Sequence, residues 1–287
     1  MKIAIVGSSG YIAGFLISRF EKDSSVEKIL KIDQTDEADV RLNLTDATKF
    51  NYNILEDIDY VVFTAAISGP DKCASDFELC WNINVTGTSC FIEEAIKKNC
   101  KVLFFSSDAV YGNIRGKIYD EESETKAETP YGRMKKAVED KFKNEQNFKC
   151  IRLSYVVSAK DRFVSYCLSC VEKNEIADVF HPFYRNCIVV NDVVNVVWWF
   201  ANNWNNYPYY VLNIAGEELV SRVRIADELN RIIDGKLKYT ISLPGGDFYK
   251  NRPQITQMKS LYLSKFNILE NNTFTEKIQN ELSCLNK

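Results

Sequence analysis

The chain has 287 residues, of which 46% are hydrophobic and 13% aromatic, so it can bury a substantial core without metal ions or disulfides. Its formal net charge of −3 comes from interspersed acids and bases, which give no basic face and predict no nucleic-acid partner. No apolar run is long enough to span a bilayer, and Met1-Lys2 leads straight into a predicted core strand, so we expect a cytoplasmic protein without a signal peptide or a membrane partner.

The first predicted elements are an apolar strand at residues 2–6, a glycine-rich turn at residues 7–14 and an amphipathic helix at residues 11–20. This strand–turn–helix order is the context in which such a turn binds a dinucleotide. Gly7 and Gly10 leave room for a tight turn and for a pyrophosphate on the backbone N–H groups at the helix start. The predicted cofactor contacts here are Gly7, Gly10, Tyr11 and Ile12. The alternative is an ordinary loop.

The second predicted strand, residues 28–32, ends at Asp33, about 20 residues after the glycines. An acidic side chain at this point can accept hydrogen bonds from the ribose hydroxyls of an adenosine. Its carboxylate would also repel a 2′-phosphate. We therefore expect a preference for NAD(H), with NADP(H) as the alternative cofactor.

A strand at residues 102–107 ends in the hydroxyls of Ser106 and Ser107, and a helix follows that carries Tyr131 and Lys135. Four residues apart, the tyrosine and the lysine lie on one helix face, where the ammonium would lower the pKa of the phenol toward neutrality. Such a pair alone is more often a solvated helix face. The preceding strand favours a catalytic reading, because Ser107 would point into the crevice where an open parallel sheet binds ligands.

Over the first 158 residues, apolar strands near residues 2, 28, 60, 102 and 150 alternate with helices near residues 11, 83 and 131. That alternation predicts an α/β fold with a Rossmann-type, doubly wound parallel sheet. Later residues break the pattern, with helices expected at 163–173, 192–199 and 223–233 and strands at 187–190 and 209–214.

The nine cysteines form an odd, scattered set in which Cys167 and Cys170 make the single Cys-x-x-Cys spacing. Without a second pair, a zinc site is not expected, and reduced thiols in the cytosol are the simpler interpretation. We predict no bound metal.

At this point the chain resembles the extended short-chain dehydrogenase/reductase family, in the branch that acts on nucleotide-activated sugars. The family's catalytic triad falls on Ser107, Tyr131 and Lys135, with Asp108 as a further candidate, and its nucleotide turn falls on Gly7, Gly10 and Ala13. Further cofactor contacts implied by the resemblance are Asn43, Leu44, Thr64, Ala65 and Ala66. Asn43 stands where the family usually has an aspartate against the adenine amino group; its amide oxygen could accept that bond.

The resemblance also implies a site for a nucleoside-diphosphate sugar. Arg185 and Arg252 match the family's two diphosphate-binding arginines, whose planar guanidinium groups suit phosphate oxygens, although both could be surface charges. Tyr155 lies on the segment that leads to the substrate. His181, the sole histidine, would contact a substrate hydroxyl or pack in a loop rather than act as a general acid.

By the same resemblance, residues 1–158 and 187–215 form a dinucleotide-binding domain, and residues 159–186 and 216–287 form a smaller sugar-nucleotide lobe. The family also implies a homodimer and a place in polysaccharide biosynthesis.

Departures from the family pattern narrow the reaction. Ala109 follows Asp108 where the sugar 4,6-dehydratases have a glutamate, which disfavours dehydration. Asp108 also occupies the position of the cysteine used by the 3,5-epimerising reductases. The expected reaction is therefore NAD(P)H-dependent reduction of the 4-keto group of a nucleoside-diphosphate deoxysugar. A 4-epimerase with tightly bound NAD, a dehydrogenase and a non-catalytic nucleotide-binding scaffold remain alternatives.

Overall fold

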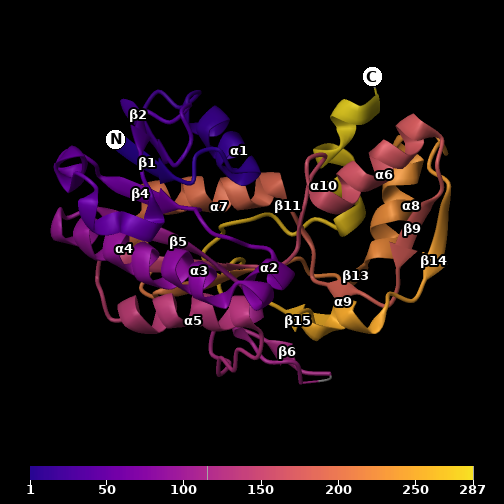
Figure 1. Cartoon of the computed structure of the whole chain (residues 1–287). Coiled ribbons are helices and arrows are strands. Elements are labelled where there is room, and N and C mark those ends of the chain that lie inside the picture. Colours follow the sequence, from indigo (N-terminus) through magenta and orange to yellow (C-terminus); the bar gives the residue numbers. More distant parts are fainter. Residues whose placement is uncertain (115, 287) are drawn as a thin grey trace. The chain divides into compact units, whose positions relative to one another are not determined.

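The computed structural model describes residues 1–114 and 116–286 (Figure 1). The chain forms two compact units. Unit 1 comprises Met1–Gly112, Glu124–Arg152 and Val194–Leu212, and unit 2 comprises Asn113–Ser123, Leu153–Val193 and Asn213–Lys287.

A seven-stranded sheet forms the centre of unit 1, in the order β12-β7-β5-β4-β1-β2-β3. Its strands are β1 (Lys2–Val6), β2 (Lys28–Asp33), β3 (Val40–Arg41), β4 (Tyr60–Phe63), β5 (Lys101–Ser107), β7 (Phe148–Leu153) and β12 (Val211–Ile214). The β1–β2, β1–β4, β2–β3 and β4–β5 pairs are parallel. This confirms the predicted doubly wound sheet, whose strand order reverses direction between β1 and β4, the place where such folds bind ligands.

Helices cover both faces of this sheet. They are α1 (Tyr11–Phe20), α2 (Pro70–Ser75), α3 (Phe77–Trp81), the π-helical turn η3 (Asn82–Gly87), α4 (Thr88–Lys97), α5 (Pro130–Phe142) and α7 (Val190–Asn203), with short 3₁₀ helices η1 (Leu44–Lys49), η2 (Tyr52–Leu55), η4 (Asp108–Val110) and η5 (Trp204–Asn206). In Figure 1, α1 and α7 lie on one side and α4 and α5 on the other. Trp198 of α7 donates to Asp23 just after α1, at 2.5 Å. The sheet is therefore buried on both faces, which explains its continuous apolar strands.

Unit 2 has a four-stranded sheet in the order β13-β10-β15-β6 and two strand pairs, β11–β8 and β14–β9. Its strands are β6 (Ile118–Tyr119), β8 (Val156–Val157), β9 (Ala177–Phe180), β10 (Tyr184–Arg185), β11 (Ile188–Val189), β13 (Val220–Ser221), β14 (Tyr239–Ser242) and β15 (Ile255–Met258). Its helices are α6 (Arg162–Lys173), α8 (Arg222–Ile232), α9 (Gly246–Lys250), α10 (Phe274–Glu281) and η6 (Ser283–Asn286). The core between α6, α8 and α10 contains Val164, Leu229 and Ile278.

The borders of the two units differ from the predicted domain borders because strands pair across those predicted borders. Val156 and Val157 pair with Ile188 and Val189, which draws both segments into unit 2. Ile118 pairs with Gln257, so an excursion from the first half of the chain joins unit 2 as well. These are contacts between residues far apart in sequence, which a chain-order reading does not reveal. The assignment of substrate binding to the second unit stays a prediction.

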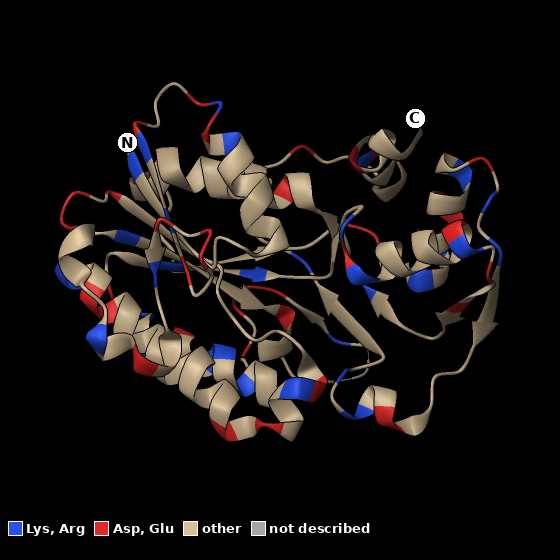
Figure 2. Cartoon of the chain, turned by 45° about the horizontal axis from the view of Figure 1, so that its top comes forward, with Lys and Arg blue, Asp and Glu red and all other residues tan. Residues whose placement is uncertain are grey.

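Charged residues of both signs are interspersed over the helices and loops (Figure 2). Many form exposed pairs one helical turn apart, such as Lys72 with Asp76 at 2.8 Å and Lys136 with Asp140 at 2.5 Å. Within the described ranges, no helix combines the length and the apolar character needed to cross a membrane.

Candidate active site

A cavity of about 360 Å³ opens where the carboxyl ends of β1, β2 and β4 meet in unit 1. Its lining includes most of the predicted cofactor contacts: Gly7, Gly10, Asp33, Asn43, Leu44, Thr64, Ala65 and Ala66. Tyr11 and Ile12 form the first turn of α1 and are not among its lining residues. The fold thus gathers these residues from four separate segments of the chain around one space at the reversal point of the sheet.

Gly7 requires glycine for two independent reasons. Its φ angle of +87° lies in the left-handed region that other residues adopt at a cost. A Cβ atom there would lie 2.6 Å from the backbone nitrogen of Ala65 and 2.8 Å from Oγ1 of Thr64. The turn after β1 therefore passes directly against the segment after β4, and both face the cavity.

Asp33 is held in a defined orientation at the end of β2. Its Oδ2 atom accepts hydrogen bonds from the backbone nitrogen and the hydroxyl of Ser9, both at 2.9 Å, and its Oδ1 atom accepts one from Gln34 N at 2.7 Å. The side chain is 9% exposed and lines the cavity. Ser9, which the sequence analysis did not single out, thus ties the acidic residue to the glycine-rich turn.

In the structure, the side chain of Asn43 caps a helix, whereas the sequence analysis expected it to contact the adenine amino group. Its Oδ1 atom accepts from the backbone nitrogen of Thr45 at 3.0 Å and from the Thr45 hydroxyl at 2.8 Å, which caps η1. Asparagine is a favoured N-cap residue, so local capping explains it. The oxygen predicted to meet an adenine amino group already accepts two bonds within the protein.

The predicted triad residues come together at the end of β5. Ser107 caps η4, where its hydroxyl donates to Asp108 Oδ1 at 3.0 Å and accepts from the Ala109 nitrogen at 3.2 Å. Helix α5, capped by Thr129, packs against η4 and carries Tyr131 and Lys135. A Cβ atom at Gly132 would lie 2.0 Å from the carbonyl oxygen of Ala109. The close approach that places the helix beside the serine therefore depends on this glycine.

Lys135 is 2% exposed, and its Nζ atom donates to the Phe105 carbonyl at 2.7 Å. The Nζ atom also lies 4.4 Å from the centre of the Phe104 ring and 5.8 Å from that of Tyr131. Burial lowers the pKa of Lys135 to about 7, and the opposing attraction of Glu139 does not restore it. The lysine can therefore change its charge near neutral pH.

For Tyr131 the structure differs from the expected fall in pKa. Burial raises the pKa of its phenol above the usual value, and the nearby Cys73 and Asp108 raise it further. The ring packs against a small cluster of Cys73, Cys80 and Met134. Desolvation, which penalises the phenolate, is the largest cause of this rise. Within the protein alone, the phenol is therefore protonated at neutral pH.

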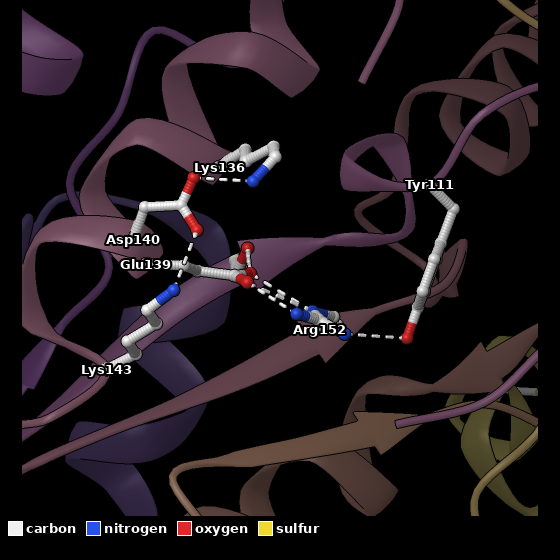
Figure 3. A network of polar contacts seen from close by, with 7 residues as sticks. Tyr111, Lys136, Glu139, Asp140, Lys143 and Arg152 are labelled. Carbon is white, nitrogen blue, oxygen red and sulfur yellow. Dashed lines mark hydrogen bonds and ion pairs between the residues drawn. The ribbon is translucent and has the colours of Figure 1, made fainter. Parts of the chain in front are cut away.

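A buried polar network connects Tyr111, Glu139 and Arg152 (Figure 3). Arg152 on β7, 2% exposed, donates from Nη2 to Glu139 Oε2 at 2.6 Å and from Nη1 to the Tyr111 hydroxyl at 2.8 Å. Glu139 lies one turn after Lys135 on α5 and also accepts from the Ser106 hydroxyl. The network therefore fixes α5 to β5 and β7. The sequence analysis did not identify this network. The four-residue spacing of Lys135 and Glu139, which places both on one face of α5, was the signal for it along the chain.

Of the residues predicted to contact the substrate, Ser107 and Asp108 lie in unit 1, whereas Tyr155, His181, Arg185 and Arg252 lie in unit 2, where several already have partners. The Tyr155 hydroxyl donates to Asp161 Oδ1 at 3.0 Å. Arg185 is 7% exposed and donates to backbone carbonyls of Tyr184, Pro253 and Gln254. Arg185 thus joins β10 to the segment before β15, and its predicted diphosphate contact stays a prediction.

The two other predicted residues of unit 2, His181 and Arg252, contact aromatic rings. Nδ1 of His181 is buried and has no partner among the described residues, and its ring meets that of Tyr184 edge-on. Arg252 donates to the Phe248 carbonyl at 3.2 Å and lies over the Phe248 ring.

Comparisons with known proteins agree with this fold. A dTDP-4-dehydrorhamnose reductase from Clostridium acetobutylicum matches at a TM-score of 0.86, with 19% identity and full coverage of both chains. The UDP-glucuronic acid 4-epimerase from Bacillus cereus, solved with UDP-glucuronic acid and NAD, matches at 0.77, with 19% identity over 99% of each chain. A dTDP-4-dehydrorhamnose reductase from Bacillus anthracis, solved with NADP, matches at 0.83, with 17% identity over 98% of each chain. At such identities the likeness shows the fold.

Among curated proteins, the dTDP-D-glucose 4,6-dehydratase of Homo sapiens is 28% identical over 157 residues. The match covers 48% of this chain and 45% of the human protein, so it spans less than half the length of that relative. A family model, described as the NAD dependent epimerase/dehydratase family, matches residues 3–215, most of the chain and nearly all of unit 1. The chain therefore belongs to the NAD dependent epimerase/dehydratase family.

Proposed function

We propose that this protein reduces the 4-keto group of a nucleoside-diphosphate deoxysugar with NAD(H), with NADP(H) as a second donor. The observation that carries the proposal is the geometry at the end of β5, where Ser107 caps η4 and helix α5, which carries Tyr131 and Lys135, packs against η4. A phenol held at this point can protonate the alkoxide that forms when a keto group is reduced.

The cavity of unit 1 fits a dinucleotide. The turn at Gly7 has no room for a side chain, and the helix N-terminus that follows it suits a pyrophosphate. The fixed carboxylate of Asp33 suits the ribose hydroxyls. When bound, the reduced nicotinamide supplies hydride to the sugar carbon. NADPH binding at least as tightly as NADH would contradict the preference that rests on Asp33.

The protein's own residues supply the proton and the orientation. Tyr131 donates its phenolic proton to the C4 oxygen as negative charge develops there. The Ser107 hydroxyl turns from Asp108 Oδ1 toward the same oxygen and orients the carbonyl. Donation of the proton turns Tyr131 into a phenolate. In its charged form, Lys135, held by the Phe105 carbonyl, stabilises this phenolate.

The test is a direct assay with a panel of nucleoside-diphosphate 4-keto-6-deoxyhexoses, following NADH consumption and the reduced sugar. Turnover of at least one substrate, lost in Tyr131→Phe, is expected. A 4-epimerase would use the same residues with a retained cofactor. Denaturing purified protein and measuring released dinucleotide separates the two, because near-stoichiometric NAD without net NADH consumption would contradict the reductase.

Three finer expectations belong to this proposal. The described cysteines are free and mostly buried, which supports function in a reducing compartment such as the cytoplasm. Assembly as a homodimer, and a role in polysaccharide biosynthesis, follow from the family resemblance. Light scattering after gel filtration measures the oligomeric state, and a monomeric mass at working concentration would contradict the dimer.

A further inference from the structure

Three arginines and two phenylalanines of unit 2 form a continuous row. The Cζ atom of Arg185 lies 4.3 Å from the centre of the Phe183 ring, and that of Arg222 lies 4.7 Å from the same centre. Arg222 and Arg252 lie 5.4 Å and 5.0 Å from the centre of the Phe248 ring. The centres of the Phe183 and Phe248 rings lie 5.6 Å apart. We call this arrangement the arginine–phenylalanine row.

The members of the row differ in how their N–H groups are used. Arg185 donates to three backbone carbonyls and is almost fully buried. Arg222, the first residue of α8, has no such partners: its Nε atom is buried without a hydrogen bond, and its side chain contacts the rings of Phe163, Phe183 and Phe248. In the part of the chain that the structure describes, no hydrogen bond uses its guanidinium.

Neighbouring charges compensate Arg222 only in part, because its pKa remains lowered. The carboxylate of Asp161, which influences it electrostatically, already accepts four hydrogen bonds, from the Tyr155 hydroxyl and from the backbone nitrogens of Ser158, Phe163 and Val164. Burial lowers the pKa of Arg222, and the nearby positive charge of Arg252 lowers it further. A desolvated guanidinium beside a second cation is costly unless an anion joins them.

We propose that Arg222, together with Arg252, binds the diphosphate of the sugar nucleotide, while Arg185 holds the backbone that carries them. This inference rests on the proposed function, because it assumes a nucleoside-diphosphate substrate. Guanidinium groups bind phosphate oxygens through paired N–H groups, and Arg222 has these groups unused by the protein. Phe183 and Phe248 hold the planar cations in place, which reduces the ordering that binding requires.

The first test is calorimetric titration of the full-length protein with UDP and dTDP, in the wild type and in Arg222→Gln. We expect binding of the accepted diphosphate to weaken about 10- to 100-fold, the range for losing hydrogen bonds to a charged group. Uridine and thymidine, followed by ligand-detected NMR, should bind both proteins alike. Arg231→Gln is the matched control, because Arg231 is exposed on the same helix and its partner Glu228 keeps Arg224.

The fold of unit 2 needs its own readout, since all four tryptophans lie in unit 1. Hydrogen exchange of the α8 peptide provides it. If Arg222→Gln binds UDP or dTDP as tightly as the wild type while α8 is still protected, Arg222 does not bind the diphosphate. The proposed function would not be affected by this result. Failure of the wild type to bind any nucleoside diphosphate would instead contradict the proposed function.

A second measurement needs no variant. Phenylglyoxal labels accessible guanidinium groups, and the label at Arg222 is quantified by mass spectrometry in the wild-type protein. Protection of Arg222 by the bound diphosphate, but not by the matching nucleoside, is expected, with Arg231 labelled equally in all samples. Unchanged labelling of Arg222 at saturating diphosphate would refute the proposal even if Arg222→Gln fails to fold.

Discussion

Two arginines, Arg152 buried in unit 1 and Arg222 half-buried in unit 2, show how the same side chain is used in opposite ways. Arg152 in unit 1 has its donors paired with Glu139 and Tyr111, so its charge is compensated inside the protein. Arg222 in unit 2 contacts three aromatic rings and leaves its Nε atom without a partner. A paired buried charge joins structural elements, whereas a desolvated charge without a hydrogen-bonding partner suits a ligand.

The largest expected effect concerns the residue that the Arg152 network positions. Tyr131→Phe keeps the ring and removes the hydroxyl, so turnover should fall by roughly 10²- to 10⁴-fold, as is usual for losing a general acid. Steady-state kinetics measure the fall, with dinucleotide affinity as the control, which should change little. Near-full turnover would show that another group, such as Asp108, donates the proton.

The next largest effect tests the pairing of Arg152 itself. Arg152→Met leaves Glu139 buried without its cation, and the free energy of unfolding should fall by about 3–5 kcal/mol. Tryptophan fluorescence during urea unfolding reports on unit 1, which contains all four tryptophans. The double variant Arg152→Met with Glu139→Met should recover much of the loss. If Arg152→Met is as stable as the wild type, the ion pair of Arg152 with Glu139 does not stabilise unit 1, and the comparison with Arg222 is wrong.

A smaller effect is expected from the glycine that brings α5 against η4. Gly132→Ala places a methyl group against the Ala109 carbonyl, which should lower the free energy of unfolding by about 1–3 kcal/mol and reduce turnover by displacing Tyr131. Gly14→Ala is the matched control, because Gly14 lies in α1 with open space around its Cβ position and should be neutral or stabilising. If the Gly132→Ala variant had the same turnover as the wild type, Gly132 would not be needed to position Tyr131.

The smallest effect follows from the lowered pKa of Lys135. Its pKa is about 7 in the folded protein and 10.5 in a model peptide, so the unfolded chain binds more protons between these values. Stability contributed by this residue should therefore rise with pH above 7, by at most about 1.4 kcal/mol per pH unit. Urea unfolding at pH 7 and pH 8 should show this rise in the wild type relative to Lys135→Met. Lys149, whose pKa is also lowered, is present in both proteins and cancels.

The amino-acid sequence alone predicted the sheet, the glycine-rich turn and the triad because these depend on local patterns. Apolar runs, a glycine at the required left-handed position and a four-residue helical spacing are all visible along the chain. The same patterns placed Asp33 at the end of its strand, and the structure adds the hold of Ser9 on its carboxylate.

Only the tertiary structure decided how the predicted polar groups are used, because hydrogen-bond partners and burial depend on residues distant in sequence. Asn43 became a cap, Arg185 a holder of backbone carbonyls, and the pKa of Tyr131 rose where Lys135 had been expected to lower it. Arg222 has no motif that marks it, and its isolation among three rings comes from strands and helices that meet only in the fold. A residue type shows which bonds a side chain can make, and packing determines which remain for a ligand.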